Sequence, residues 1–98
     1  MKTGKVFKEC EKKGIYWITE TYYEPLCERA MERGLEEITD ELVIEEIKYQ
    51  FEHAPYGCHF APVFDYDAYE KELYSEEYKE AKKEYNALKR MYKKYCEV

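Results

Sequence analysis

Hydrophobic residues recur along most of the chain at steps of three and four, which is the period of an amphipathic α-helix. Near the start, Val6, Phe7 and Cys10 fall on one helical face. Gly14 follows them, and glycine is the residue that most often ends a helix. These positions predict a first helix over residues 3–13.

The next amphipathic segment predicts a second helix that ends at about Arg33, before Gly34. Thr21 and Glu24 have the spacing of a capping box, and Pro25 is typical of a first helical turn. The expected apolar stripe of this helix comprises Tyr23, Leu26, Cys27, Ala30 and Met31.

Residues 15–19 separate these two helices and are rich in β-branched and aromatic side chains. Such a composition favours a short strand. Because the sequence offers no obvious partner strand, an extended linker that packs Trp17 inward is the alternative.

The second half of the chain predicts two more helices. Thr39 is a natural N-cap for a third helix over residues 40–54, which Pro55 closes. Asp65 is the expected cap of a last helix that extends to about residue 96. Residues 54–64, between them, contain no Asp, Glu, Lys or Arg, so we expect this loop to lie against the core. The inner face of the third helix comprises Val43, Ile44, Ile47 and Phe51.

The last helix has a heptad seam dominated by tyrosine. Its positions alternate steps of four and three: Tyr74, Tyr78, Ala81, Tyr85, Leu88, Tyr92 and Tyr95. Tyrosine offers a large contact area with a polar tip that tolerates a wet boundary. We expect the seam to pack within the chain against the second and third helices, with a homodimer seam or a partner-facing surface as alternatives. The patterns together predict a mainly α-helical fold, a compact bundle of about four helices in a single domain over residues 1–98.

Composition narrows the function classes. The chain has 98 residues, with 22 acidic and 16 basic side chains and a net charge of −6. That balance argues against a general nucleic-acid binder, which needs clustered cations for phosphate contacts. No apolar run approaches the roughly 20 residues of a membrane span, and the first residues lack the apolar centre of a signal peptide. We therefore expect a cytoplasmic protein.

The charge is unevenly distributed along the chain. Residues 1–19 hold five lysines and two glutamates, whereas residues 20–52 hold eleven acids and three bases. Residues 65–98 are nearly balanced, with nine acids and eight bases. The negative charge of the whole chain therefore comes from its second quarter.

Within this quarter, acidic residues recur every four positions, at Glu20, Glu24, Glu28, Glu32 and Glu36. Glu24, Glu28 and Glu32 are the secure helical members, about 6 Å apart along one face. Phosphates along a nucleic-acid strand have a comparable separation. Further acids extend this field towards the third helix: Glu37, Asp40, Glu41, Glu45, Glu46 and Glu52. The row is either an ordinary solvated helix face or an electrostatic surface that competes for a cationic groove.

Four cysteines and two histidines raise the question of a metal site. In a cytoplasmic chain these cysteines are expected to be buried thiols or metal ligands, because disulfides are disfavoured there. His53, Cys58 and His59 lie within seven residues and could chelate one structural Zn²⁺, with Cys27 or Cys10 as a fourth ligand. The alternative is a set of core thiols with a histidine that bonds to its own loop.

Patterns that indicate catalysis are weak. Cys58 and His59 are adjacent in the sequence, and neighbouring side chains rarely form the hydrogen bond between nucleophile and base. The chain has four glycines and lacks both a glycine-rich phosphate loop and a nucleophile elbow. We therefore expect the chain to act by binding and not as an enzyme.

The acidic set from Glu20 to Glu52 and the tyrosine seam from Tyr74 to Tyr95, in a chain of this size, resemble small acidic phage-encoded inhibitors of the anti-CRISPR kind. The resemblance is one of size and composition and transfers no residue role. It implies inhibition of a nucleic-acid-handling enzyme, such as a Cas nuclease, whose DNA or RNA loading an acidic face blocks in the host cytoplasm. Direct binding to nucleic acid or to a membrane is not expected, and the chain is expected to be a monomer or a homodimer.

The expected contact residues combine acids with exposed aromatic anchors. They are Glu24, Glu28, Glu32, Asp40, Glu41, Glu45, Tyr22, Tyr49 and Tyr56. Two other functions stay open. One is a structural adaptor that dimerises through the tyrosine seam, and the other is a small regulatory protein stabilised by zinc at Cys27, His53, Cys58 and His59.

Overall fold

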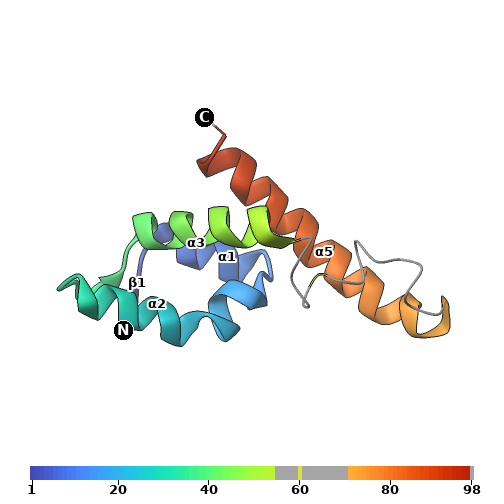
Figure 1. Cartoon of the computed structure of the whole chain (residues 1–98), viewed down its shortest axis with the longest axis horizontal. Coiled ribbons are helices and arrows are strands. Elements are labelled where there is room, and N and C mark those ends of the chain that lie inside the picture. Colours follow the sequence, from blue (N-terminus) through green and yellow to red (C-terminus); the bar gives the residue numbers. More distant parts are fainter. Residues whose placement is uncertain (55–59, 61–70, 98) are drawn as a thin grey trace.

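The computed structural model describes residues 1–54, 60 and 71–97, and most of these residues are helical (Figure 1). The elements follow the chain in the order β1 (Lys2–Thr3), α1 (Lys5–Lys12), the π-helical turn η1 (Trp17–Thr21), α2 (Tyr23–Glu32), β2 (Glu37–Ile38), α3 (Asp40–His53) and α5 (Lys71–Tyr95). The prediction of a mainly helical fold with a long C-terminal helix is confirmed. The expected beginning of this C-terminal helix, residues 65–70, and most of the uncharged loop over residues 54–64 lie outside the described residues.

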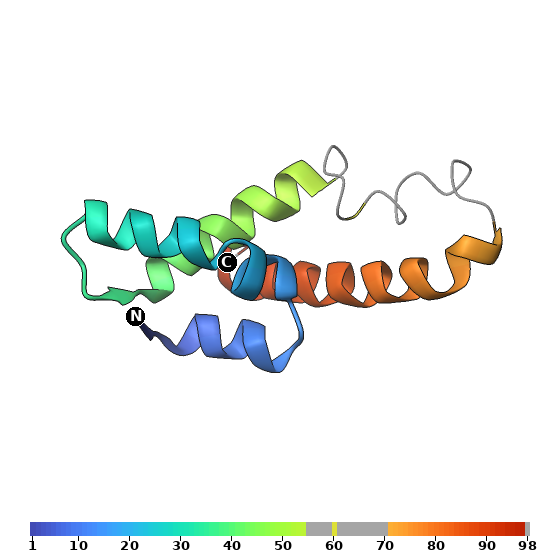
Figure 2. The same cartoon turned by 90° about the horizontal axis from the view of Figure 1, so that it is seen from below.

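The helices are arranged around α3. α2 runs antiparallel to α3 on one side, and the C-terminal half of α5 crosses α3 on another side (Figures 1 and 2). The beginning of α5, drawn in orange, extends beyond α1, α2 and α3. One hydrophobic core joins these elements, and its completely buried side chains include Ile18, Leu26, Ile38, Ile47 and Leu88.

Glycine ends the first two helices as the sequence predicts. Gly14 and Gly34 have φ angles of +73° and +71°, a left-handed conformation that costs glycine little. The N–H of Ile15 then donates to the carbonyl of Cys10 at 3.0 Å, and the N–H of Leu35 donates to the carbonyl of Ala30 at 2.8 Å. These are the six-to-one hydrogen bonds of Schellman motifs.

The prediction of a strand over residues 15–19 is wrong, because Tyr16 is helical and residues 17–19 belong to the turn η1. Ile15 and Ile18 are both completely buried, and a spacing of three places them on one helical face, whereas a strand would alternate them. The extended-linker alternative is wrong for the same reason. The strands of the molecule lie elsewhere: β1 and β2 pair in parallel, with Lys2 opposite Glu37 and Thr3 opposite Ile38.

The N-terminal caps differ from expectation at one helix and agree at another. The prediction of a capping box at Thr21 and Glu24 is wrong, because η1 leads directly into α2. The N-cap of α2 is Tyr22, which makes no side-chain cap hydrogen bond. Thr39 does cap α3, since its hydroxyl oxygen accepts a hydrogen bond from the N–H of Leu42 at 3.4 Å.

The apolar stripe of α2 is confirmed except at its end. Leu26 and Ala30 are completely buried, and Tyr23 and Cys27 are half-buried. Met31, however, is 63% exposed. It lies one residue beyond Ala30, which turns its side chain about 100° away from the buried face.

The tyrosine seam of α5 packs inside the chain from Ala81 onward. Tyr85 and Tyr92 stack on Phe51 of α3, with ring centroids 5.9 and 4.3 Å apart, and Leu88 between them is completely buried. The second contact is with α1, where the hydroxyl of Tyr95 donates to Glu9 at 2.7 Å. The expectation of an intramolecular seam against the third helix is confirmed for this part. The side chain of Tyr74 lies outside the described residues.

Candidate functional site

The glutamate row stays on the solvent side of α2. Glu24, Glu28 and Glu32 are exposed, whereas Leu26 and Ala30 on the other side of the helix are completely buried. A spacing of four residues keeps the three carboxylates on one face. Within the described residues, none of the three carboxylates has a hydrogen-bond or ion-pair partner. The row is therefore a line of negative charge without direct ion pairs, although Glu32 at its end interacts electrostatically with Arg33.

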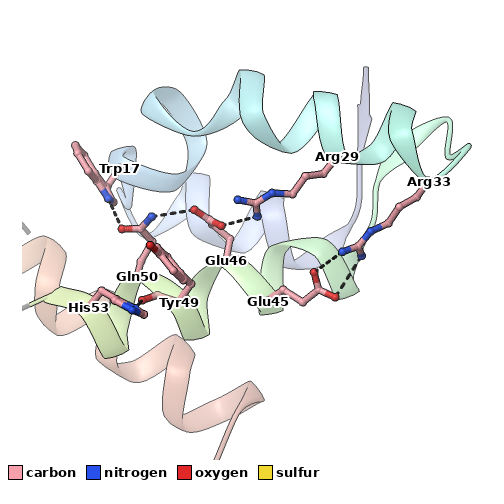
Figure 3. A network of polar contacts seen from close by, with 8 residues as sticks. All are labelled: Trp17, Arg29, Arg33, Glu45, Glu46, Tyr49, Gln50 and His53. Atoms are coloured by element: carbon pink, nitrogen blue, oxygen red, sulfur yellow. Dashed lines mark hydrogen bonds and ion pairs between the residues drawn. The ribbon is translucent and has the colours of Figure 1, made fainter.

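The two arginines of α2 do not neutralise this row, because both turn towards α3 (Figure 3). Arg33 forms a bidentate pair with Glu45, with nitrogen–oxygen distances of 3.2 and 3.0 Å. This contact raises the pKa of the Arg33 guanidinium. Glu45, expected as a free contact residue, is therefore held by the chain's own cation, although its side chain remains 47% exposed.

Glu46 does not belong to the surface field in which its sequence position placed it. It is 1% exposed and accepts from Arg29 at 2.7 Å and from the side-chain amide of Gln50 at 2.8 Å. The Gln50 oxygen in turn accepts from the indole N–H of Trp17 (Figure 3). A buried carboxylate needs such partners, because its desolvation is costly without them. This network joins η1, α2 and α3.

Asp40 also has a structural partner. Its Oδ1 accepts a hydrogen bond at 3.0 Å from the backbone N–H of Val6, in the first turn of α1. Asp40 thus caps α1 while it lies in the first turn of α3, where the helix dipole favours a carboxylate. Glu41 beside it is exposed. Of the six expected acidic contacts, Glu24, Glu28, Glu32 and Glu41 are exposed without a described partner.

The expected aromatic anchors differ in exposure. Tyr49 is 52% exposed, and its ring stacks on His53 with centroids 4.1 Å apart (Figure 3). Tyr22 is half-buried beside Trp17. Tyr56 lies outside the described residues. Tyr49 is therefore the described anchor that a partner reaches most easily.

The expected zinc ligands are only partly described. The Nδ1 of His53 lies 2.8 Å from the carbonyl oxygen of Tyr49, one turn earlier in α3. Cys27 is half-buried on α2. Cys58 and His59 lie outside the described residues, and within the described part of the chain no three His, Cys, Asp or Glu side chains gather as a metal site would need. Zinc binding stays a prediction.

Sequence reasoning missed the polar network of Trp17 and Gln50 and the cap that Asp40 provides. A signal for the network exists, because Gln50 shares a helical face with Val43, Glu46 and Ile47. It also missed two exposed apolar side chains, Tyr16 at 56% and Met31 at 63%. Met31 follows Glu28 by three residues, so it borders the glutamate row.

A comparison with known proteins finds no matching family model, no matching curated protein and no matching solved structure. Among the described residues, no helix has both the length and the apolar character of a membrane-spanning segment.

Proposed function

We propose that the chain binds through an acidic surface to a cationic cleft of a protein that handles nucleic acid, and that it inhibits this protein by occupying the cleft. The acidic surface consists of Glu24, Glu28, Glu32 and Glu41, with Met31 and Tyr49 as apolar contacts. Charge complementarity of this kind steers encounter and selects partners.

The observation that carries the proposal is that the two arginines of α2 form their ion pairs with α3 and not with the glutamate row. Like charges four residues apart destabilise a helix, so a row of three glutamates is compensated where a cation is at hand. Arg29 and Arg33 are at hand on the same helix, yet they contact Glu46 and Glu45 of α3. The row is therefore left without a direct ion pair to either arginine, with only a longer-range interaction between Glu32 and Arg33, and a cationic partner would relieve the repulsion.

The composition of the surface is suited to a protein partner. Met31 and Tyr49 are large exposed side chains, and methionine and tyrosine are enriched in the cores of protein interfaces. The carboxylates of the row repeat at about 6 Å, a spacing that suits a groove built for phosphates. The resemblance to anti-CRISPR inhibitors favours an RNA-guided nuclease as the partner.

The test is inhibition of a panel of purified RNA-guided nucleases, read as DNA loading in a gel-shift assay and as DNA cleavage. We expect the parent chain to block loading on at least one nuclease. The triple variant Glu24→Gln, Glu28→Gln, Glu32→Gln should need about 3- to 150-fold more protein, since each lost charge contact costs a few tenths to 1 kcal/mol.

The matched control is the triple variant Glu11→Gln, Glu80→Gln, Glu97→Gln, which removes the same charge from exposed positions on α1, on α5 and just after it. It should inhibit as the parent does. Equal inhibition by the parent and the row variant would show that the acidic surface is not the contact. Failure to inhibit any nuclease of the panel would remove the inhibitor function.

A further inference from the structure

A second charged surface lies on the outward side of α5. Between Lys79 and Lys94 this helix carries seven basic residues and two acidic ones. The basic residues are Lys79, Lys82, Lys83, Lys89, Arg90, Lys93 and Lys94. All seven are exposed, whereas Ala81, Ala87, Leu88 and Met91 of the same helix are buried. We call these seven residues, with Tyr78 and Asn86, the basic face.

The two acids of this stretch lie at the border with α1. Glu84 accepts a hydrogen bond at 2.7 Å from the backbone N–H of Trp17. Glu80, one turn earlier, lines with Glu84 a hollow of about 470 Å³ that α1 residues such as Glu11 and Lys12 complete. Lys83 lines this hollow as well and so lies between the two acids and the other cations of α5.

The basic face surrounds an open hollow of about 520 Å³. Its described lining consists of Tyr78, Lys79, Lys82, Lys83, Asn86 and Arg90. No carboxylate is among these lining residues. The ammonium of Lys82 lies 5.3 Å from the ring centre of Tyr78, a cation–π contact. The lining therefore combines cations with an aromatic ring and an amide.

The cations of this face are largely uncompensated. Lys94 pairs with Glu9 of α1 at 3.0 Å. Among the described residues, the other six have no carboxylate within ion-pair distance. Six uncompensated cations on one helix face repel one another, so an anionic ligand would stabilise this part of α5.

We propose that the basic face binds the phosphate backbone of a nucleic acid. From Lys79 to Arg90 the helix rises roughly 16 Å, and cations at steps of three and four along it reach two to four successive phosphates of a strand. Asn86 and Tyr78 add N–H and O–H donors, from which phosphate and sugar oxygens can accept hydrogen bonds. Clustering of lysine and arginine along one helix face is the electrostatic footprint of nucleic-acid binding.

The packing of α5 favours a nucleic acid over an anionic membrane. Over the side chains that the structure describes, the apolar side of α5 is buried in the core, so this part of the helix presents no apolar face to a bilayer.

The net charge of −6 does not oppose this binding, because the excess of acids lies outside α5, which carries eight bases and five acids. Residues 20–52 hold eleven acids and three bases, and they include all of α2 and β2 and most of α3. α2 and the C-terminal half of α5 lie on different sides of α3 (Figures 1 and 2). At physiological salt the Debye length is about 8 Å, so charges across the width of a helix are screened from each other.

The experiment is fluorescence anisotropy with a labelled 20-base-pair DNA duplex and with one of its strands, so that the two arms separate duplex from single-strand binding. We expect saturable binding of at least one probe at low salt. If three phosphates are neutralised, the affinity should fall about 40-fold between 50 and 200 mM salt.

The test variant is the triple change Lys82→Gln, Lys83→Gln, Arg90→Gln, and the matched control is Lys2→Gln, Lys5→Gln, Lys8→Gln, which removes three exposed charges from β1 and α1. We expect the test variant to bind at least ~10-fold more weakly and the control to bind as the parent does. All these side chains are exposed, so circular dichroism melting should give the parent's curve for both variants.

Three results would overturn the inference. They are no binding of either probe at low salt, equal weakening in test variant and control, and binding to phosphatidylserine vesicles without binding to either probe. The inference goes beyond the proposed function and fails separately from it. The row variant Glu24→Gln, Glu28→Gln, Glu32→Gln should keep its affinity for the labelled DNA even where nuclease inhibition is lost.

Discussion

Glu9 makes three side-chain contacts, two of which join α1 to α5. Its carboxylate accepts from Lys13 at 2.8 Å, from Lys94 at 3.0 Å and from the hydroxyl of Tyr95 at 2.7 Å. The hydrogen bonds from Lys13 and Tyr95 lower the pKa of Glu9 from 4.5 to about 2. One side chain in the first helix therefore fixes the end of the last helix.

This pKa predicts how stability depends on pH. Because the folded pKa lies below the ordinary value of 4.5, the contribution of Glu9 is complete above that value and is lost as the pH falls towards 2. Glu9→Gln should lower stability at neutral pH by about 1 kcal/mol, which corresponds to a melting temperature about 4–8 °C lower. Thermal unfolding followed by circular dichroism between neutral pH and pH ~2 measures this.

The difference in melting temperature between Glu9→Gln and the parent should shrink as the pH approaches 2, the pKa at which Glu9 of the folded protein becomes about half protonated. Glu11→Gln, an exposed change on the same helix, should melt as the parent does at every pH. A constant difference across this range would show that Glu9 acts through packing and not through its charge.

The pair of Arg29 and Glu46 predicts strong coupling between two residues. Arg29→Met leaves the buried carboxylate of Glu46 without its cation, and we expect a cost of about 3 kcal/mol. The double change Arg29→Met, Glu46→Met should cost less than the sum of the two single changes, because no uncompensated charge then remains. Urea unfolding of the four proteins measures the coupling.

The control for this cycle is the exposed pair on the same two helices. Arg33→Met breaks the contact with Glu45, whose side chain is 47% exposed, so we expect a cost below about 1 kcal/mol. Additive costs in the cycle of Arg29 and Glu46 would contradict the buried network of Figure 3.

At the scale of elements, Asp40 connects the beginnings of two helices. It belongs to the first turn of α3 and caps α1 through the N–H of Val6. Gly4, the N-cap residue of α1, allows this approach, because a Cβ at position 4 would lie 2.5 Å from the Oδ1 of Asp40. The parallel pairing of β1 with β2 holds the two segments side by side.

Asp40→Ala should therefore lower the free energy of unfolding by about 1 kcal/mol, the usual cost of losing a side-chain cap. Glu41→Ala, one residue later and exposed, should cost only a few tenths of a kcal/mol through the helix dipole. Guanidinium unfolding of both variants provides the comparison. Equal costs would show that the hydrogen bond to Val6 contributes nothing.

The element boundaries that the sequence predicts well are those set by one local residue. Gly14, Gly34 and Thr39 each end or begin a helix through their own backbone or hydroxyl. The errors concern segments whose structure depends on distant residues. Strands β1 and β2 are each two residues long and have no pattern of their own. Residues 15–19 do not form a strand, because Ile15 and Ile18 both enter a core built by other helices.

The candidate site follows the same division. The exposure of Glu24, Glu28 and Glu32 follows from helical spacing, so the sequence predicts it. Which acidic side chains form ion pairs or hydrogen bonds within the chain depends on tertiary contacts. Glu45 and Glu46 differ by one position, yet one is a surface ion pair and the other is buried, and Asp40 contacts a residue 34 positions away.

For the whole molecule, the packing of α5 changes how the tyrosine seam is tested. Leu88 is completely buried against the core of its own chain. Leu88→Lys should therefore unfold the protein, with a loss of about 3 kcal/mol or more, and should not simply convert a dimer into a monomer. Urea unfolding measured beside light scattering separates the two effects.

Arg90→Gln changes an exposed residue of the same helix and should leave both the unfolding curve and the mass unchanged. A stable, folded Leu88→Lys protein of half the parent's mass would show instead that the seam joins two copies. That result would support a structural adaptor that dimerises through the tyrosine seam.

Trp17 gives the molecule a built-in optical reporter. It is the single tryptophan of the sequence, its indole donates to Gln50 of α3, and its backbone N–H donates to Glu84 of α5. Its intrinsic emission therefore originates at the junction of these helices. Ligands that shift α5 should change the wavelength of this emission without any attached dye, whereas ligands confined to the far side of α2 should leave it constant.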